Sequence, residues 1–142
     1  MIIAVDFDGT IVTHEYPKIG REIPFAIESL KRLQQDYEYQ LVLWTVREGA
    51  ELEEALEYCR NRGLEFYAVN NNYPEETPND KQPRKIKADL FLDDRNLGGM
   101  PDWGIIYRMI TTGKYLEPIT DEIEPEYILP KKKGIFATLF GR

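Results

Sequence analysis

The sequence predicts an α/β fold built around a mostly parallel sheet. Short apolar runs rich in β-branched residues alternate along the chain with longer segments that carry an apolar stripe at helical spacing. Strands that alternate with helices form right-handed βαβ units, in which successive strands lie parallel. The chain has 142 residues, which is the size of one ordinary domain.

The first half of the chain is expected to hold two strands and two helices. The first strand covers about residues 2–7, and a polar, turn-like segment over residues 9–23 follows it. Pro24 suits the first turn of a helix, because its fixed φ and missing N–H cost little there. The second strand covers residues 39–44. The next helix covers residues 48–62 and has glutamates near its beginning, where the helix dipole favours negative charge.

The second half continues the alternation and ends in a segment without a clear period. Gly63 is expected to end the preceding helix, since glycine readily adopts the left-handed conformation common at that position. The elements expected after it are strands over residues 66–69 and 88–92, a loop over residues 70–84 and a helix from Pro101 to Gly113. We expect residues 1–113 to form the core and residues 114–142 to form an extension that packs on the core or on a neighbouring subunit.

Composition and charge argue against several classes of protein. The formal net charge is −7 and the sequence pI is about 4.8, whereas a nucleic-acid-binding protein usually presents a basic face. Cys59 is the only cysteine, so no intramolecular disulfide forms, which fits a reducing compartment. We expect neither a signal peptide nor a membrane helix, because the apolar runs are too short for either. The expected location is the cytoplasm.

Polar side chains follow three of the expected strands at equivalent points. Asp6 and Asp8 come at the end of the first strand, Thr45 ends the second, and Asp93 and Asp94 follow the fourth. Because the carboxyl ends of parallel strands meet at one edge of a sheet, these groups are expected to converge. Crowded carboxylates repel one another unless a cation or a shared proton intervenes. Mg²⁺ takes oxygen ligands, so the pattern predicts a site for Mg²⁺ and a phosphate group.

These motifs resemble the haloacid dehalogenase superfamily. The run Asp6-Phe7-Asp8-Gly9-Thr10, the apolar strand ending in Thr45 and the pair Asp93-Asp94 match three of its motifs, in the same order and strand context. The resemblance covers about residues 1–112. It implies a Rossmann-like sandwich of three layers with a mostly parallel central sheet, and the activity of a Mg²⁺-dependent phosphohydrolase. The implied mechanism cleaves phosphate monoesters through an aspartyl-phosphate.

The resemblance also implies roles for single residues. Asp6 would be the nucleophile and Asp8 the general acid and base, while Thr45 would hold the transferring phosphoryl group. The metal ligands would be Asp6, Asp8 through its backbone carbonyl, Asp93, and Asp94 beside it. An acid at the position of Asp8 points to phosphoryl transfer rather than dehalogenation.

Other candidate residues are less clearly defined by the sequence. The superfamily also has a catalytic lysine, and we choose Lys85 because it lies just before the fourth strand, while Lys81 and Lys87 remain alternatives. Arg47 could bind substrate phosphate or an adjacent acid, and otherwise would be a surface arginine at a helix beginning. Asn70 follows the third strand on the same sheet edge and could line the substrate pocket.

The chain resembles the members of the superfamily that lack a cap domain. Only 15 residues separate Asp8 from Pro24, and another 15 separate Val69 from Lys85, so neither insertion point has room for a domain. We therefore expect a homo-oligomer in which a neighbouring subunit or the C-terminal segment partly covers the site. The substrate is expected to be a phosphorylated small molecule or macromolecule, which the sequence does not identify.

Two other classes of function share part of this pattern. A phosphoacceptor signalling domain uses similar groups, but there the acidic pair comes early and the lysine last, whereas Asp93-Asp94 follow Thr45 and every candidate lysine. A catalytically silent binding module on the same fold would be expected to lack Asp6 or Asp8, and both are present. The order of the motifs therefore favours the enzyme.

Overall fold

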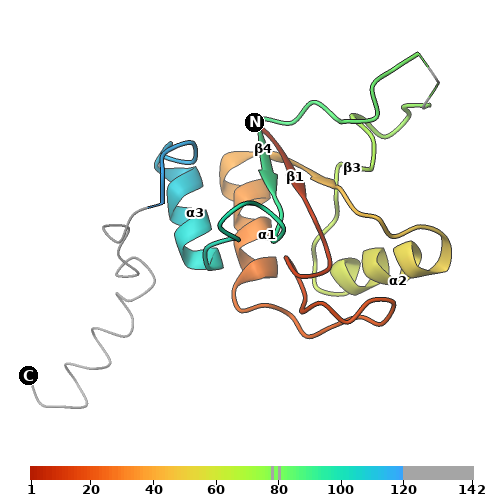
Figure 1. Ribbon diagram of the computed structural model, residues 1–142, viewed down its shortest axis with the longest axis horizontal. Coiled ribbons are helices and arrows are strands. Elements are labelled where there is room, and N and C mark those ends of the chain that lie inside the picture. Colours follow the sequence, from red (N-terminus) through yellow and green to blue (C-terminus); the bar gives the residue numbers. More distant parts are fainter. Residues whose placement is uncertain (78, 80, 120–142) are drawn as a thin grey trace, which may run out of the picture. The chain divides into compact units, whose positions relative to one another are not determined.

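The computed structural model describes residues 1–77, 79 and 81–119, and Figure 1 shows its elements in order. The chain divides after Met100 into two compact units. The first unit contains the sheet, and the second begins at Pro101. Most of the C-terminal extension expected over residues 114–142 lies outside the described residues, including its basic and apolar end.

A four-stranded sheet with the order β3-β2-β1-β4 forms the centre of the first unit. Its strands are β1 (Ile2–Val5), β2 (Gln40–Leu43), β3 (Ala68–Val69) and β4 (Leu90–Leu92). All neighbouring pairs are parallel; Ala4, for example, lies opposite Val42 on one side and Phe91 on the other. The prediction of an α/β fold with a mostly parallel sheet is therefore confirmed.

Two helices connect the first three strands. Helix α1 (Ala26–Tyr37) joins β1 to β2, and helix α2 (Gly49–Arg60) joins β2 to β3. Both crossovers step in the same direction across the sheet, so right-handed connections place both helices over one face. The connection from β3 to β4 passes to the other side of β1, and its described residues form no helix.

The alternation of side chains along the strands divides the core between the two faces of the sheet. One face carries a cluster of small buried residues around Ala4, joined by Ile86 from the β3–β4 connection. The opposite face carries fully buried branched residues, which are Ile3, Val5, Leu41 and Leu43. The connection therefore covers, through Ile86, a face that a helix covers in many α/β folds.

The ends of the first two helices are defined by backbone conformation. Helix α1 begins at Ala26, two residues later than Pro24 suggested, because Phe25 has a φ of 68° and so interrupts the helical path. Gly63 has a φ of 81°, and Leu64 beyond it donates to the Cys59 carbonyl at 2.9 Å. Gly63 therefore closes the turn after α2 in the left-handed conformation expected for it, while the helix itself ends at Arg60 and not at residue 62.

The second unit contains helix α3 (Trp103–Thr111). Asp102 caps its beginning, since a side-chain oxygen accepts a hydrogen bond from the Ile105 backbone N–H at 3.0 Å. Gly113 follows the helix with a φ of 74°, as expected for a residue beyond a helix end. Among the described residues, no helix has both the length and the apolar character to cross a membrane.

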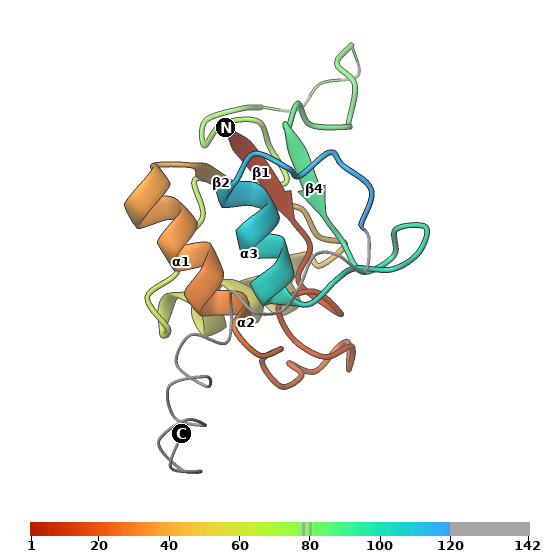
Figure 2. The same ribbon diagram turned by 90° about the vertical axis from the view of Figure 1, so that its left-hand side faces the viewer.

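The strand order determines where a site is expected. β1 leads to β2 on one side, while β4 enters the sheet on the other side of β1, so the connections diverge on either side of this strand. Figure 2 shows β1 and β4 side by side, in agreement with their pairing. Open α/β sheets bind ligands outside the carboxyl ends of the strands at such a point.

Candidate functional site

Three carboxylates meet where β1 and β4 end. Asp6, Asp93 and Asp94 each offer one oxygen, and these three oxygens all lie within 4.8 Å of one another. The backbone holds the two segments together, because the Asp6 N–H donates to the Leu92 carbonyl at 2.9 Å. The convergence expected for these three residues is thus present in the structure.

The crowding of the three carboxylates is visible in the electrostatics of Asp6. Burial is the largest cause that raises the pKa of this carboxyl from 3.8 to about 7. The charge of Asp93 adds to the increase, the Phe7 backbone N–H opposes it, and Asp94 and Asp8 contribute less. A divalent cation would remove this repulsion. A set of three carboxylate oxygens fits a hard cation such as Mg²⁺.

Thr10 links the two halves of this cluster, although no role was predicted for it from the sequence. Its side chain is fully buried, and its hydroxyl lies 3.5 Å from Asp6 Oδ2 and 3.4 Å from Asp94 Oδ1. The hydroxyl oxygen also accepts a hydrogen bond from the Asp94 backbone N–H at 3.1 Å. A hydroxyl that directly follows Asp-Gly was the signal that could have identified it.

Gly9 lets the turn after β1 approach the cluster closely. Its φ is 85°, and a Cβ atom placed there would collide with the Asp94 carboxylate. The Phe7 carbonyl accepts from the N–H groups of Thr10 and Ile11 at 3.2 and 2.9 Å, which closes the turn. Only glycine satisfies both the backbone conformation and the space at this position.

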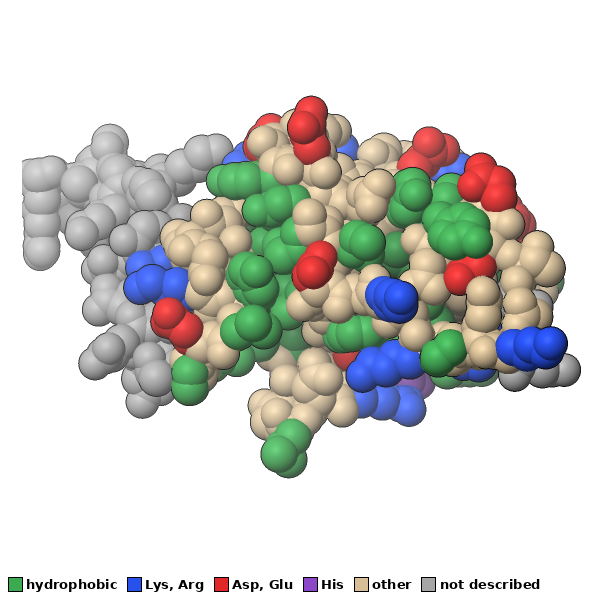
Figure 3. Space-filling model, turned by 90° about the horizontal axis from the view of Figure 1, so that it is seen from above, with side chains coloured by type: hydrophobic (Ala, Val, Ile, Leu, Met, Phe, Trp, Pro, Cys, Tyr) green, Lys and Arg blue, Asp and Glu red, His purple; other side chains and the backbone are tan. Residues whose placement is uncertain are grey.

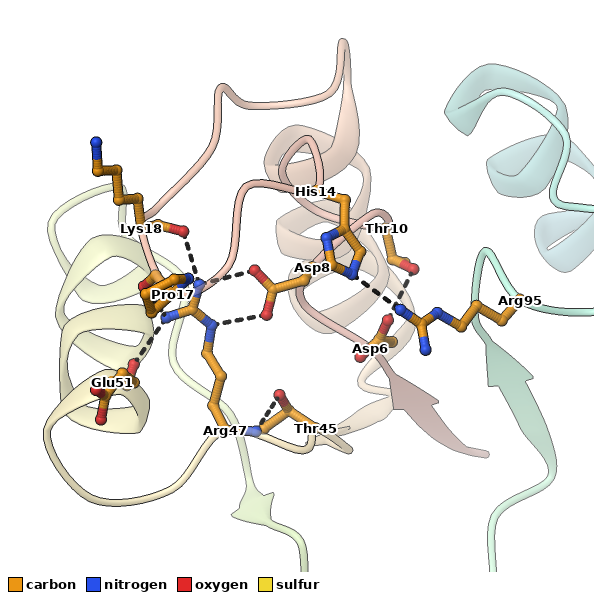
Figure 4. A network of polar contacts seen from close by, with 10 residues as sticks. All are labelled: Asp6, Asp8, Thr10, His14, Pro17, Lys18, Thr45, Arg47, Glu51 and Arg95. Atoms are coloured by element: carbon orange, nitrogen blue, oxygen red, sulfur yellow. Dashed lines mark hydrogen bonds and ion pairs between the residues drawn. The ribbon is translucent and has the colours of Figure 1, made fainter.

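Asp8 lies outside this cluster, and its side chain binds Arg47 instead. Both carboxylate oxygens accept from the guanidinium, Oδ2 from Nε and Oδ1 from Nη2, each at 2.7 Å (Figure 4). The Asp8 residue is 6% exposed and Arg47 is 1% exposed. The hydrogen bond from Arg47 to Asp8 is the main cause that raises the pKa of the guanidinium above its usual value. Asp8 therefore contributes no side-chain oxygen to the three-carboxylate cluster.

Arg47 also binds three backbone carbonyls. Nη1 donates to Pro17 at 3.1 Å and to Glu51 at 3.2 Å, and Nη2 donates to Lys18 at 2.9 Å. All five N–H groups of the guanidinium thus have acceptors. The interpretation of Arg47 as a surface arginine is wrong, and binding to an adjacent acid is confirmed. No donor is left for a substrate phosphate in this arrangement.

Thr45 and Asn70 lie at the ends of the neighbouring strands β2 and β3. The Thr45 hydroxyl accepts from the Arg47 backbone N–H at 3.0 Å, and the Thr45 backbone N–H donates to Asn70 Oδ1 at 2.8 Å. Asn70 has a φ of 54°, a conformation that asparagine tolerates better than most residues. Asn70 also lines a small polar pocket together with Asn72, Glu76 and Arg84. Through its hydrogen bond with the Thr45 backbone N–H, Asn70 fixes the backbone that carries Thr45.

The three candidate lysines are not brought together with the carboxylates by any hydrogen bond or ion pair between described residues. Lys85 Nζ lies 5.2 Å from the centre of the Phe91 ring, over a strand of the sheet. Lys81 and Lys87 use their backbone N–H groups to bind Asn79 and Asn72. The choice among the three lysines stays a prediction.

A basic pair lies beside the three-carboxylate cluster. The only histidine of the chain, His14, has its Nε2 3.0 Å from Nη2 of Arg95, and both residues are exposed. Figure 3 shows the histidine beside Lys and Arg side chains on the surface. Arg95 follows Asp94 directly, and its backbone N–H donates to Asp93 Oδ1 at 2.9 Å. Arg95 was not among the residues predicted for the site.

One solved structure is similar to this chain over most of its length. It is the structure of a conserved protein coded by a locus from Bacteroides thetaiotaomicron, with 66% sequence identity and a TM-score of 0.76. The match covers 80% of this chain and 92% of the other. No protein-family model matches the sequence, and no curated protein matches it.

Proposed function

We propose that this chain, which belongs to the same family as the conserved Bacteroides thetaiotaomicron protein, is a Mg²⁺-dependent phosphohydrolase that cleaves phosphate monoesters. The observation that carries the proposal is the three-carboxylate cluster of Asp6, Asp93 and Asp94 at the carboxyl ends of β1 and β4. These three residues would hold the cation. Bound there, Mg²⁺ would supply positive charge that neutralises phosphate oxygens.

The proposed reaction has two steps on Asp6. An Asp6 oxygen attacks phosphorus, the bond from phosphorus to the leaving oxygen breaks, and the leaving oxygen receives a proton. Water then attacks the phosphorus of the aspartyl-phosphate, which releases inorganic phosphate and restores the carboxylate. As the resemblance to the haloacid dehalogenase superfamily implies, protonated Asp8 gives its proton to the leaving oxygen in the first step, and the Asp8 carboxylate takes a proton from the attacking water in the second. Thr45 holds the phosphoryl oxygens, and Lys85 is the proposed catalytic lysine.

The proposal also covers the fold in more detail than the α/β class and the parallel sheet. We assign the chain to the Rossmann-like, three-layer arrangement of the superfamily, in its form without a cap domain. Among the described residues, the connections after β1 and β3 contain no helix beyond α1, which is consistent with an uncapped site. A cytoplasmic location, a phosphorylated metabolite or macromolecule as substrate, and a homo-oligomer remain parts of this proposal.

Phosphate release tests the proposed function directly. The purified chain is incubated with p-nitrophenyl phosphate in Mg²⁺, in EDTA, and in EDTA followed by excess Mg²⁺. We expect turnover only where free Mg²⁺ is present, and none from Asp6→Asn in any condition. Full activity in EDTA would exclude a metal role, and a phosphorylated Asp6 that persists for hours would favour the signalling alternative. A panel of sugar, nucleotide and peptide phosphates then identifies the substrate class.

A further inference from the structure

We propose that Arg47 is a positioning residue, which fixes the Asp8 carboxylate beside the site and anchors the tip of the β1–α1 loop, defined here as residues 13–22. This inference rests on the proposed function and adds a role within it. The supporting observation is that one buried guanidinium ties the beginning of α2 to two places about 30 to 39 residues earlier in the chain. These places are Asp8 in the turn after β1 and the tip of the β1–α1 loop, and a further bond to the Glu51 carbonyl holds the guanidinium against the first turn of α2.

The geometry leaves Arg47 little freedom to do anything else. Its guanidinium carbon lies 5.1 Å from the ring centres of both Phe7 and Tyr16, so two aromatic rings pack against the planar group. Its five N–H groups are all taken by acceptors within the fold. A side chain held in this way acts on the reaction only through the groups that it positions.

The position of the Asp8 carboxylate depends on the two-bond fork. Two parallel N–H···O bonds fix both the place and the plane of a carboxylate, which a single point charge does not do. Asp8 remains near enough to Asp6 that its charge contributes to the raised pKa of that carboxyl. A displacement of about 1 Å at a catalytic group can lower a rate by about 10²-fold.

Arg47 also secures the tip of the β1–α1 loop, whose ends are closed separately. At the ends, the Thr13 N–H donates to the Arg21 carbonyl at 2.7 Å, and the Arg21 N–H donates to Thr13 Oγ1 at 2.9 Å. At the tip, the carbonyls of Pro17 and Lys18 accept from Arg47. The loop carries His14 to its contact with Arg95, so the anchor also helps to hold this basic pair in place.

Kinetics of single and double variants test the positioning role. Arg47→Lys keeps the charge but loses the fork, and we expect kcat for p-nitrophenyl phosphate to fall about 10²-fold while KM changes less than about threefold. Arg60→Met is the matched control, because Arg60 ends α2 and its ion pairs with Glu53 and Glu57 are exposed; its kcat is expected to stay within about twofold.

A double-mutant cycle separates positioning from general damage. If Arg47 acts through Asp8, Arg47→Met lowers kcat by less than about twofold in the Asp8→Asn background, since the group that it positions is already lost. A merely structural role would lower kcat in both backgrounds by the same factor. Equal factors, or a wild-type kcat in Arg47→Lys, would overturn the inference. An inactive wild-type chain would instead overturn the proposed function.

Limited proteolysis tests the loop anchor without any activity measurement. Asp8→Asn/Arg47→Met leaves neither partner as a buried charge, so it is compared with Asp8→Asn under native conditions. We expect trypsin to cut the double variant first after Lys18 or Arg21, with Asp8→Asn and Arg60→Met resistant there. Equal resistance of the loop in all three variants would contradict the anchor. Cleavage spread over the whole chain would show global unfolding and would contradict it as well.

Discussion

Asp6 and Asp8 are the same residue type two positions apart, yet their surroundings are opposite. Asp6 lies among carboxylates, and the pKa of its carboxyl is raised to about 7. Asp8 is buried deeper but accepts two short hydrogen bonds from Arg47. Among the described residues, the fold supplies a cation, Arg47, for the Asp8 carboxylate, but it pairs the Asp6 carboxylate with none. We therefore expect Asp6→Asn to raise the stability of the fold without metal and Asp8→Asn to lower it.

The largest expected effect is the loss of activity in Asp6→Asn. An amide is not a nucleophile, so we expect phosphate release to fall by about 10³-fold or more. Without metal, the same variant should melt at a higher temperature than wild type at pH 8, because one charge leaves a crowded site. Melting curves in EDTA and a phosphate assay in Mg²⁺ measure both changes. A variant that keeps wild-type turnover would remove Asp6 from the nucleophile role.

Asp8→Asn should lower both activity and stability. Loss of a general acid and base typically costs about 10²–10⁴-fold in rate, and less for a substrate with an acidic leaving group. The buried Arg47 charge would lose its partner, which costs about 3 kcal/mol. Chemical denaturation measures the loss, with Glu28→Gln as control, because its ion pair with Arg32 is exposed and contributes about 0.5 kcal/mol or less. A stability gain in Asp8→Asn would contradict the comparison.

The pH dependence of stability should separate the two carboxylates further. The folded state raises the pKa of Asp6 from 3.8 to about 7, so it binds more protons than the unfolded state between these values. The contribution of Asp6 to the free energy of unfolding is therefore fully present below about pH 4. It is lost as pH rises toward 7, and the loss is roughly 4 kcal/mol at most. The melting temperature of Asp6→Asn minus that of wild type, measured in EDTA from pH 4 to 8, should increase with pH. A flat difference would contradict the raised pKa.

The smallest expected effect concerns the hydroxyl that links the two halves of the cluster. Thr10→Val keeps the shape but leaves the Asp94 backbone N–H without its acceptor, which costs about 1–2 kcal/mol. We expect phosphate release to fall about tenfold, since Asp94 and Asp6 lose a shared contact. Thr112→Val serves as the control, because it removes the hydrogen bond from the Thr112 hydroxyl, just after α3, to the Arg108 carbonyl. If Thr10→Val and Thr112→Val released phosphate at the same rate, Thr10 would have no role in the site.

Much of the fold could be predicted because it depends on local patterns. The runs around Ala4, Val42 and Phe91 are apolar on both sides, as strands buried in a parallel sheet require. The ends of the helices and strands were predicted less accurately. The first strand was expected to reach residue 7, but β1 ends at Val5, because the turn that Gly9 permits draws the chain out of the sheet.

The candidate site was predictable only in the part that follows from topology. Asp6, Asp93 and Asp94 converge because their strands are parallel neighbours, and a sequence pattern contains that information. The pairing of Asp8 with Arg47 joins residues 39 positions apart and depends on the path of a loop. No periodic pattern in the sequence encodes such a path. Arg47 could therefore be interpreted as a surface arginine, although the structure buries it.

The close contact between Gly9 and Asp94 has a consequence for how this protein can vary. Any side chain at position 9 would need both a strained backbone and the space that the Asp94 carboxylate fills. A change at position 9 therefore strains the backbone in every case, and in a chain that keeps Asp94 it also displaces the carboxylate of one candidate ligand. In a library randomised at positions 9 and 94, selection for activity should return Gly9 and Asp94 together. Selection for folding alone should also admit combinations with a smaller residue 94.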